Sequence, residues 1–166
     1  MRVLVVGGTG FIGTALCAEL KRRGHDVTAM ARNPGGSDLP GGVSKAMGDV
    51  TEYGSISESF EGMEAVYNLV ALSPLFKPSG GDRMHDRIHR QGTENVVRAA
   101  EEHGVDHLIQ VSALGADPNG ATAYIRSKGQ AEAVVTDSDL GYTIFRPSVV
   151  FGDGGEFVSF TKLLAP

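Results

Sequence analysis

The chain places a glycine-rich turn directly after a short apolar run. The segment VLVVGGTGFIG, residues 3–13, begins with four apolar or β-branched positions and then carries glycine at 7, 8, 10 and 13. An apolar run of this length that ends in glycine is typical of a buried strand, and the residues from Phe11 to Arg23 have helical periodicity. The sequence therefore predicts a strand–turn–helix unit whose turn has very little side-chain bulk.

Apolar runs of strand length alternate with helical segments along the rest of the chain. The expected strands are Arg2–Val6, Asp26–Ala31, Val43–Gly48, Ala65–Ala71, His107–Ser112 and Tyr142–Arg146. The expected helices are Phe11–Arg23, Ser55–Phe60, Thr93–His103 and Ala123–Thr136. Gly24 and Gly104 stand where two helices should end, and Ser55 with Glu58 fits a capping box at the start of a third. This alternation predicts an α/β fold with a parallel sheet covered by helices on both faces.

Three glycines of the first turn form the pattern G-x-x-G-x-x-G between the expected strand and helix. Gly7 permits the tight turn, Gly10 lets the backbone approach a pyrophosphate, and Gly13 lets the helix pack against the first strand. The amides and dipole at the helix N-terminus attract negative charge, and Thr9 can add a hydroxyl donor. The alternative is a sharp strand-to-helix turn without a ligand. The pattern favours a dinucleotide site.

The residue after the second strand predicts which dinucleotide is preferred. An acidic residue there would accept a hydrogen bond from the ribose 2′-hydroxyl of NAD, but this chain has Arg32. A guanidinium can pair with a 2′-phosphate and stack on adenine, so we expect NADP to be preferred over NAD. The alternative is a solvated arginine and a site that binds either. Asp49 and Val50 could contact the adenine edge, although Asp49 could equally cap the following turn; Phe11 and Ile12 are further cofactor-binding candidates.

A second group of residues predicts carbonyl chemistry. Tyr124 and Lys128 are four residues apart at the start of a helix, hence on one face, and Ser112 closes the preceding strand. Lys128, together with the positive charge of an oxidised nicotinamide, should lower the pKa of Tyr124 from about 10 toward neutrality. Tyr124 would then exchange a proton while a hydride moves, and Ser112 would bind the substrate oxygen. Tyr-x-x-x-Lys by itself also fits an exposed pair without chemistry.

Composition and charge exclude several partners. The chain has 166 residues, about one domain, with a net charge of −5, so no basic face for nucleic acid is expected. Cys17 cannot form an internal disulfide, and no apolar run is long enough for a signal peptide or for membrane insertion, so we expect a cytoplasmic protein. His85 and His89 have the spacing of two metal ligands on one helix, but no third ligand is evident; we expect surface or crevice-facing histidines and no metal.

Four segments match a known superfamily in order: GGTGFIG, GTENVVRAAEEHGVDHLIQVSALGA, YIRSKGQAE and FRPSVVFG. On these residues the chain resembles the short-chain dehydrogenases/reductases, on the extended and atypical side that holds NAD-dependent epimerases and dehydratases. The stretches YNLVA, YIRSK and RPSVVFG are most similar to bacterial and archaeal relatives of the nucleotide-binding accessory subunit of respiratory complex I. The likeness covers essentially the whole chain.

The resemblance implies a Rossmann-type, doubly wound domain over residues 1–166, with strand order 3-2-1-4-5-6 and bound NAD(P). Val70 and Ala71 would line the adenine and ribose side, with Pro147, Ser148 and Val149 near the nicotinamide. A small carboxy-terminal substrate domain normally follows in this superfamily. Residues 155–166 read as the start of a fresh amphipathic helix, so we expect the chain to be the amino-terminal part of a longer protein that lacks that domain here.

The resemblance also places Ser112, Tyr124 and Lys128 on the catalytic positions of the superfamily, whereas His89 stands where many members have Asn. The first expectation is an oxidoreductase or epimerase-type enzyme that acts on an unknown small molecule. The alternative is a nucleotide-holding protein without turnover that senses redox state or stabilises a respiratory assembly. A transcriptional regulator that reads the NADP/NAD ratio is disfavoured because Tyr124 is present. Homodimers in this superfamily often form through the helices expected at Thr93–His103 and Ala123–Thr136.

Overall fold

The strands of the sheet all run parallel to their neighbours. The computed structural model describes residues 1–152, 155–157 and 160–161, and within these the sheet has the order β3-β2-β1-β4-β5-β6. The strands are β1 (Arg2–Val6), β2 (Asp26–Ala31), β3 (Ser44–Met47), β4 (Ala65–Asn68), β5 (His107–Val111) and β6 (Gly141–Phe145). The predicted fold class and strand order are confirmed.

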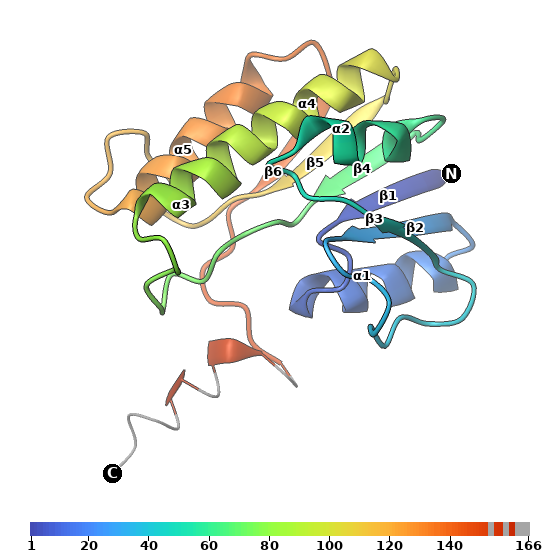
Figure 1. Cartoon of the computed structure of the whole chain (residues 1–166), viewed down its shortest axis with the longest axis horizontal. Coiled ribbons are helices and arrows are strands. Elements are labelled where there is room, and N and C mark those ends of the chain that lie inside the picture. The colour runs from blue at the N-terminus through green and yellow to red at the C-terminus, as the bar shows by residue number, and fades with distance from the viewer. Residues whose placement is uncertain (153–154, 158–159, 162–166) are drawn as a thin grey trace.

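Helices cover both faces of the sheet (Figure 1). Helix α1 (Phe11–Arg22) packs on one face. The helical elements of the other side are α2 (Tyr53–Ile56), the 3-10 turn η1 (Ser57–Phe60), α3 (Arg83–His85), the π-helical turn η2 (Asp86–Gln91), α4 (Gly92–Glu102) and α5 (Ala123–Thr136). The elements α3, η2 and α4 follow one another without a break. No helix among the described residues is long and apolar enough to cross a membrane.

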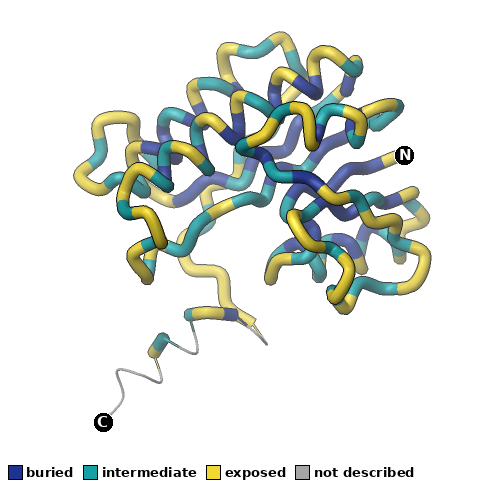
Figure 2. Tube along the Cα trace, in the orientation of Figure 1, coloured by how far each residue is buried: buried dark blue, intermediate teal, exposed yellow. Residues whose placement is uncertain are grey.

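The first strand is buried on both faces, as the continuous apolar run predicts for a central parallel strand. Val3 and Val5 pack with Cys17 of α1, whereas Leu4 and Val6 belong to the core on the opposite side, with Val96 of α4. Figure 2 shows this buried layer running through the middle of the molecule. Burial of apolar surface on both faces of the sheet stabilises this central strand.

The starts of two helices differ from the prediction, and β4 ends at Asn68 instead of at Ala71. Ser55 does not cap a helix: α2 begins at Tyr53, and the Ser55 hydroxyl donates to the carbonyl of Glu52 and accepts from the amide of Asp49. The capping-box prediction for Ser55 and Glu58 is therefore wrong, because Ser55 already lies inside the first helical turn. The helix expected at Thr93 is preceded by ten further helical residues, from Arg83.

The sequence also predicts which glycines end helices and where a last helix begins. Gly24 and Gly104 adopt positive φ directly after α1 and α4, as expected of glycines that end helices. Of the helix expected over 155–166, residues 156–157 and 160–161 are helical, and 158–159 and 162–166 lie outside the described residues.

The strand order reverses direction between β1 and β4, which are neighbours. Connections from two such strands leave toward opposite sides of the sheet, so a crevice opens at their carboxyl ends. The glycine turn follows β1, and residues 69–72 follow β4 without regular secondary structure. The fold therefore brings the glycine turn and the end of β4 to the two sides of one crevice.

Candidate functional site

The glycine turn is shaped by close backbone approaches. Gly7 has φ of +84°, and its amide donates to the carbonyl of Met30 at 2.9 Å. A Cβ on Gly13 would lie 2.3 Å from the carbonyl oxygen of Gly7, so at this position α1 packs against the glycine turn. Gly8, which the motif does not include, would place a Cβ 2.7 Å from that of Ala29 on β2. No side chain larger than hydrogen fits at Gly8 or Gly13.

The first turn of α1 is open toward the crevice. Gly10 is the N-cap residue, no side chain caps the helix, and its first turn holds no acidic residue. A helix N-terminus leaves its first amides without intrahelical partners, and its dipole favours an anion. The glycines of the turn leave these amides uncovered by side chains. The glycine turn and the start of α1 therefore form a site that fits a pyrophosphate.

Two adjoining clefts make up the crevice. The first, of about 610 Å³, is lined by the predicted cofactor residues Gly7, Thr9, Gly10, Arg32, Asp49, Val50, Val70 and Ala71. Residues of this cleft that the sequence analysis missed are Val6, Met30, Ala31, Asn33, Gly48, Leu69, Leu72 and Ile88. Most of these lie at or just after the ends of β1, β2, β3 and β4, so the position of a residue at the carboxyl end of an expected strand was the available signal.

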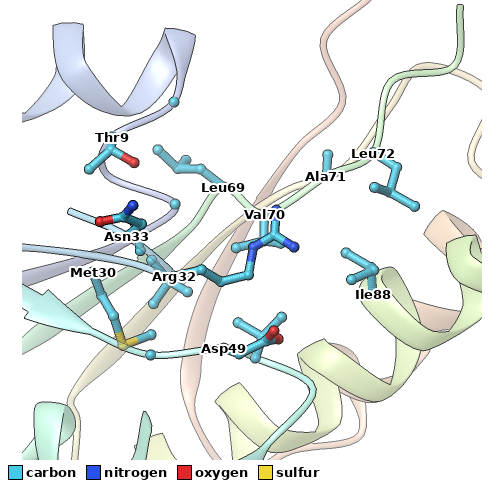
Figure 3. A pocket seen from close by; sticks show the side chains of 16 residues that line it. Thr9, Met30, Arg32, Asn33, Asp49, Leu69, Val70, Ala71, Leu72 and Ile88 are labelled. Carbon is cyan, nitrogen blue, oxygen red and sulfur yellow. The ribbon is translucent and has the colours of Figure 1, made fainter. Parts of the chain in front are cut away.

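Arg32 and Asp49 have different surroundings in the first cleft. Figure 3 shows the Arg32 side chain extending into the cleft between the glycine turn and the helix that carries Ile88. Within the described residues Arg32 has no ion-pair partner. The Asp49 carboxylate accepts from both the amide and the hydroxyl of Thr51 at 2.9 Å. Asp49 thus caps the turn after β3 while it also lines the cleft.

The second cleft, of about 430 Å³, contains the predicted catalytic residues. Its predicted members are Gly7, Gly10, Phe11, Ile12, Gly13, Ala71, Ser112, Tyr124, Lys128, Pro147, Ser148 and Val149. It shares Gly7, Gly10, Leu69, Ala71 and Leu72 with the first cleft, so the two form one continuous crevice. The remaining lining residues are Ser73, Pro74 and Leu75, from the irregular stretch Ser73–Asp82 that the sequence suggests as a cover for the nicotinamide end, and Val111, Ala113, Val150, Glu156 and Phe157, which the sequence analysis missed.

Lys128 is deeply buried beneath this cleft. Its side chain is 1% exposed, and its Nζ donates to the backbone carbonyl of Val111 at 3.1 Å. Burial lowers the pKa of Lys128 to about 8, against a smaller opposing effect of Glu132. Burial also raises the pKa of the Tyr124 phenol, which is opposite to the expected lowering. A hydrogen bond therefore holds Lys128 at the last residue of β5. The positive charge that would activate Tyr124 is buried beneath the cleft that Tyr124 lines.

Ser112 is 4% exposed, and its hydroxyl is buried without a hydrogen-bond partner among the described residues. A buried hydroxyl without a partner costs free energy, of the order of 1–3 kcal/mol. Ser112 directly follows β5 and lines the second cleft together with Tyr124. Its hydroxyl is therefore available to a ligand oxygen bound in that cleft.

The two histidines of the η2 region are buried, so the expectation of surface or crevice-facing histidines is wrong. His85 and His89 both contact the Tyr124 ring edge to face, with ring centroids 5.7 and 5.5 Å away. The Nε2 of His89 accepts from the amide of Leu72 at 2.9 Å, and its Nδ1 lies 2.9 Å from the Ser127 hydroxyl, which in turn donates to the Tyr124 carbonyl. These bonds assign the Nδ1–H tautomer to His89. Burial and the charge of Lys128 lower its pKa to about 3.

Gly129, in the middle of α5, has a packing reason. A Cβ there would lie 2.3 Å from the backbone carbon of Asp117 and the backbone nitrogen of Pro118. The loop after β5 therefore rests directly on α5, and this close backbone approach accounts for a glycine inside the helix. This contact places the loop next to the helix that carries Tyr124 and Lys128. Among the described residues, no three His, Cys, Asp or Glu side chains gather as a metal site would require.

Comparison with known proteins places this geometry in context. A family model described as NAD(P)H-binding matches residues 7–159. The chain is 31% identical over 180 residues to a 2-alkyl-3-oxoalkanoate reductase of Stenotrophomonas maltophilia, with 94% of this chain and 53% of that protein covered. It is 30% identical to the mitochondrial NADH-ubiquinone oxidoreductase 40 kDa subunit of Neurospora crassa, with 89% and 40% covered. The chain thus spans about half the length of these relatives or less.

Among solved structures, the chain is similar to the Bordetella bronchiseptica enzyme WbmG in complex with NAD. The TM-score is 0.80 at 26% sequence identity, and the match covers 99% of this chain and 59% of that enzyme. The same fold therefore holds NAD in a related protein.

Proposed function

Because the chain belongs to the NAD(P)H-binding family of the short-chain dehydrogenase/reductase superfamily, we propose that it is an oxidoreductase with Tyr124 as its acid/base residue. The observation that carries the proposal is the second cleft, in which Ser112, Tyr124 and Lys128 line the same space as the glycine turn. A dinucleotide laid across both clefts would have its reactive end beside these three side chains. The resemblance inferred from the sequence motifs agrees with the family match.

Each residue has a distinct part in the proposed reaction. When bound, NAD(P)H supplies a hydride to a substrate carbon. The Tyr124 hydroxyl donates the proton that the substrate oxygen then needs, and Ser112 donates a hydrogen bond to the same oxygen. Lys128 stabilises the tyrosinate that results. Burial raises the pKa of the Tyr124 phenol in this structure. A Tyr124 pKa near neutrality therefore requires the positive charge of an oxidised nicotinamide in addition to that of Lys128.

We further propose that the cofactor is NADP in preference to NAD. Arg32 lines the first cleft and is not engaged by an acidic side chain among the described residues. A guanidinium in that position suits the doubly charged 2′-phosphate of NADP, which it can bind through two parallel hydrogen bonds. Asp49 lies in the same cleft but already accepts two hydrogen bonds from Thr51.

A second candidate function is a nucleotide-holding protein without turnover, in which the bound nucleotide senses redox state or stabilises a respiratory assembly. Two observations favour it: Lys128 Nζ donates to the Val111 carbonyl, and burial raises the pKa of Tyr124. The similarity to a complex I subunit supports the same alternative. The cofactor residues are identical in both proposals, so only turnover separates them.

A fluorescence titration with NADPH and NADH tests both proposals. Under the first, NADPH binds more tightly than NADH, Arg32→Ala removes the difference, and Tyr124→Phe retains binding but loses hydride transfer to carbonyl compounds. Arg83→Ala is the matched control, because Arg83 is exposed and lines neither cleft. Tight binding without hydride transfer by the unaltered chain, across a broad panel of carbonyl compounds, would favour the second candidate. Failure to bind either nucleotide would contradict both.

A further inference from the structure

The part of the second cleft that lies beyond the glycine turn is walled by hydrocarbon. Its lining side chains there are Leu72, Pro74, Leu75, Ala113, Val150 and Phe157. These come from three separate places: the loop after β4, the end of β5, and the segment after β6. Figure 1 shows the segment after β6, in orange and red, running past the loop that precedes α3.

Aromatic packing joins two of these walls. The Phe76 ring, from the loop after β4, meets that of Phe160 edge to face, with centroids 5.9 Å apart. Phe157 itself lines the cleft, and Glu156 beside it is exposed. The apolar character of the wall therefore continues into the contact that brings the two segments together.

Charged groups in this cleft are few and are poorly placed for an anion. Among its described lining residues Lys128 is the one cation, and its Nζ is buried and bonded to the Val111 carbonyl. Glu156 is the one carboxylate. The hydroxyl of Ser73 is also engaged, since it accepts from the amide of Leu75. The uncharged polar side chains that remain for a substrate are the hydroxyls of Ser112 and Tyr124, which suit a single oxygen atom, and the exposed hydroxyl of Ser148.

Physical chemistry then separates substrate classes. A diphosphate needs cations or several amides to replace its hydration, and a carboxylate buried without such partners costs several kcal/mol. A neutral ketone needs one or two donors at its oxygen and hydrocarbon around the rest of the molecule. The second cleft provides the oxygen donors and the hydrocarbon that a neutral ketone needs, and its described lining side chains do not provide the free cations that an anion needs. Glu156 adds like-charge repulsion against an anion.

On the premise of the proposed reductase function, we infer that the substrate is an uncharged ketone or aldehyde flanked by hydrocarbon, and that Glu156 rejects anionic substrates. In the reaction the carbonyl carbon receives a hydride, with its electron pair, from NADPH, which is oxidised to NADP⁺. The π electron pair of the C=O bond moves to oxygen, and the Tyr124 proton completes the alcohol. Solvent then returns a proton to Tyr124.

A pair of probes that differ by one charge tests the inference. Methyl 4-oxo-4-phenylbutanoate and 4-oxo-4-phenylbutanoate have the same aryl ketone, and UDP-glucose represents nucleotide sugars. Binding of each to the NADPH-saturated chain is measured by calorimetry, and oxidation of NADPH is followed in parallel. The ester is expected to bind at least about tenfold more tightly than the acid and than UDP-glucose, because tenfold corresponds to only about 1.4 kcal/mol of desolvation.

Three results would go against the inference, and each is distinct. If the acid or UDP-glucose binds as tightly as the ester, the substrate class is wrong while the proposed function stands. If NADPH binds but the ester does not, the substrate class is again wrong. If the chain does not bind NADPH in the preceding titration, the proposed function fails and the inference fails with it.

Glu156→Gln isolates the carboxylate. We expect the acid to bind about threefold more tightly to this variant, with the ester unchanged, because one like charge near the cleft is removed. Glu61→Gln is the control. Glu61 is exposed in the turn that precedes β4, at the amino-terminal ends of the strands and therefore away from the cleft. An unchanged ester-to-acid ratio in Glu156→Gln would overturn the role given to Glu156.

Discussion

The Nε2 of His89 accepts a hydrogen bond from the backbone amide of Leu72 at 2.9 Å. This bond joins the π-helical turn η2 to the loop after β4, which walls the second cleft. Through Nδ1, the same imidazole reaches Ser127, the residue before Lys128. One buried side chain therefore ties the cleft wall to the helix that carries the candidate catalytic residues.

His89→Leu should destabilise the protein and loosen this wall. The substitution keeps apolar volume but leaves the Leu72 amide without its acceptor, which costs about 1–3 kcal/mol when no water replaces it. The free energy of unfolding, measured in urea, should fall by about 2 kcal/mol. Hydrogen exchange at the Leu72 amide should accelerate, whereas the Val5 amide in β1 should be affected only through the global loss. Unchanged exchange at Leu72 would show that the bond does not restrain the loop.

The low pKa of His89 predicts a loss of stability in acid. Its folded pKa is about 3, against 6.5 for an ordinary histidine, so below pH 6.5 the unfolded chain takes up a proton that the folded chain does not. Stability is therefore fully present above pH 6.5 and is lost as the pH falls toward 3. The difference in unfolding free energy between the natural chain and His89→Asn should shrink by about 2 kcal/mol between about pH 7.5 and pH 5.

Two neighbours of His89 bear on that measurement. Burial also lowers the pKa of His85, against the opposing charge of Asp82, and Lys128, whose pKa is about 8, is mainly protonated over this range. Because His85 is retained in the Asn variant, its contribution cancels in the difference. A difference that stays constant across this range of pH would show that His89 takes up its proton in the folded protein over the same range as in the unfolded chain.

Lys128→Met should stabilise the nucleotide-free fold below pH 8 and weaken the site. The Lys128 pKa falls from 10.5 to about 8 on burial, so between these values the unfolded chain binds more protons and stability rises with pH. The shift corresponds to about 3 kcal/mol that the natural chain regains as the pH rises through that window. Relative to the Met variant, the natural chain should gain stability from about pH 8 to 9.5, below the range where tyrosines ionise. A flat difference would mean that Lys128 is solvated when folded.

Much of the fold could be predicted from local pattern. The bounds of β1, β2 and α5 agree with the expectation residue for residue, because each apolar run ends where the side-chain period changes. The strand order follows once the alternation of strands and helices is recognised as a doubly wound sheet. The capping box at Ser55 failed for a local reason, since Glu52 already occupies the N-cap position and places Ser55 inside the helix.

The site was predictable only in its motif residues. Gly7, Tyr124 and Lys128 carry patterns with a chemical meaning, and the fold brings them into one crevice. Leu72 and Phe157 carry no such pattern, because hydrocarbon that walls a cleft has the same sequence signature as hydrocarbon in a core. The burial of His89 was missed because its partner, the Leu72 amide, lies 17 residues away and is invisible to side-chain spacing.

Gly129→Ala should destabilise the protein strongly, although alanine is the better helix former. A Cβ at residue 129 would lie 2.3 Å from the backbone of Asp117 and Pro118, so either the loop after β5 or the axis of α5 must move. We expect a loss of about 2–4 kcal/mol in the free energy of unfolding, which is the range for strained packing in a core. Gly54→Ala is the matched control, since a Cβ there meets nothing within 4 Å, and it should raise stability by about 0.5 kcal/mol. Thermal unfolding should therefore move in opposite directions for the two variants; if both gain stability, α5 and the loop are not in backbone contact, and the packing explanation for Gly129 is wrong.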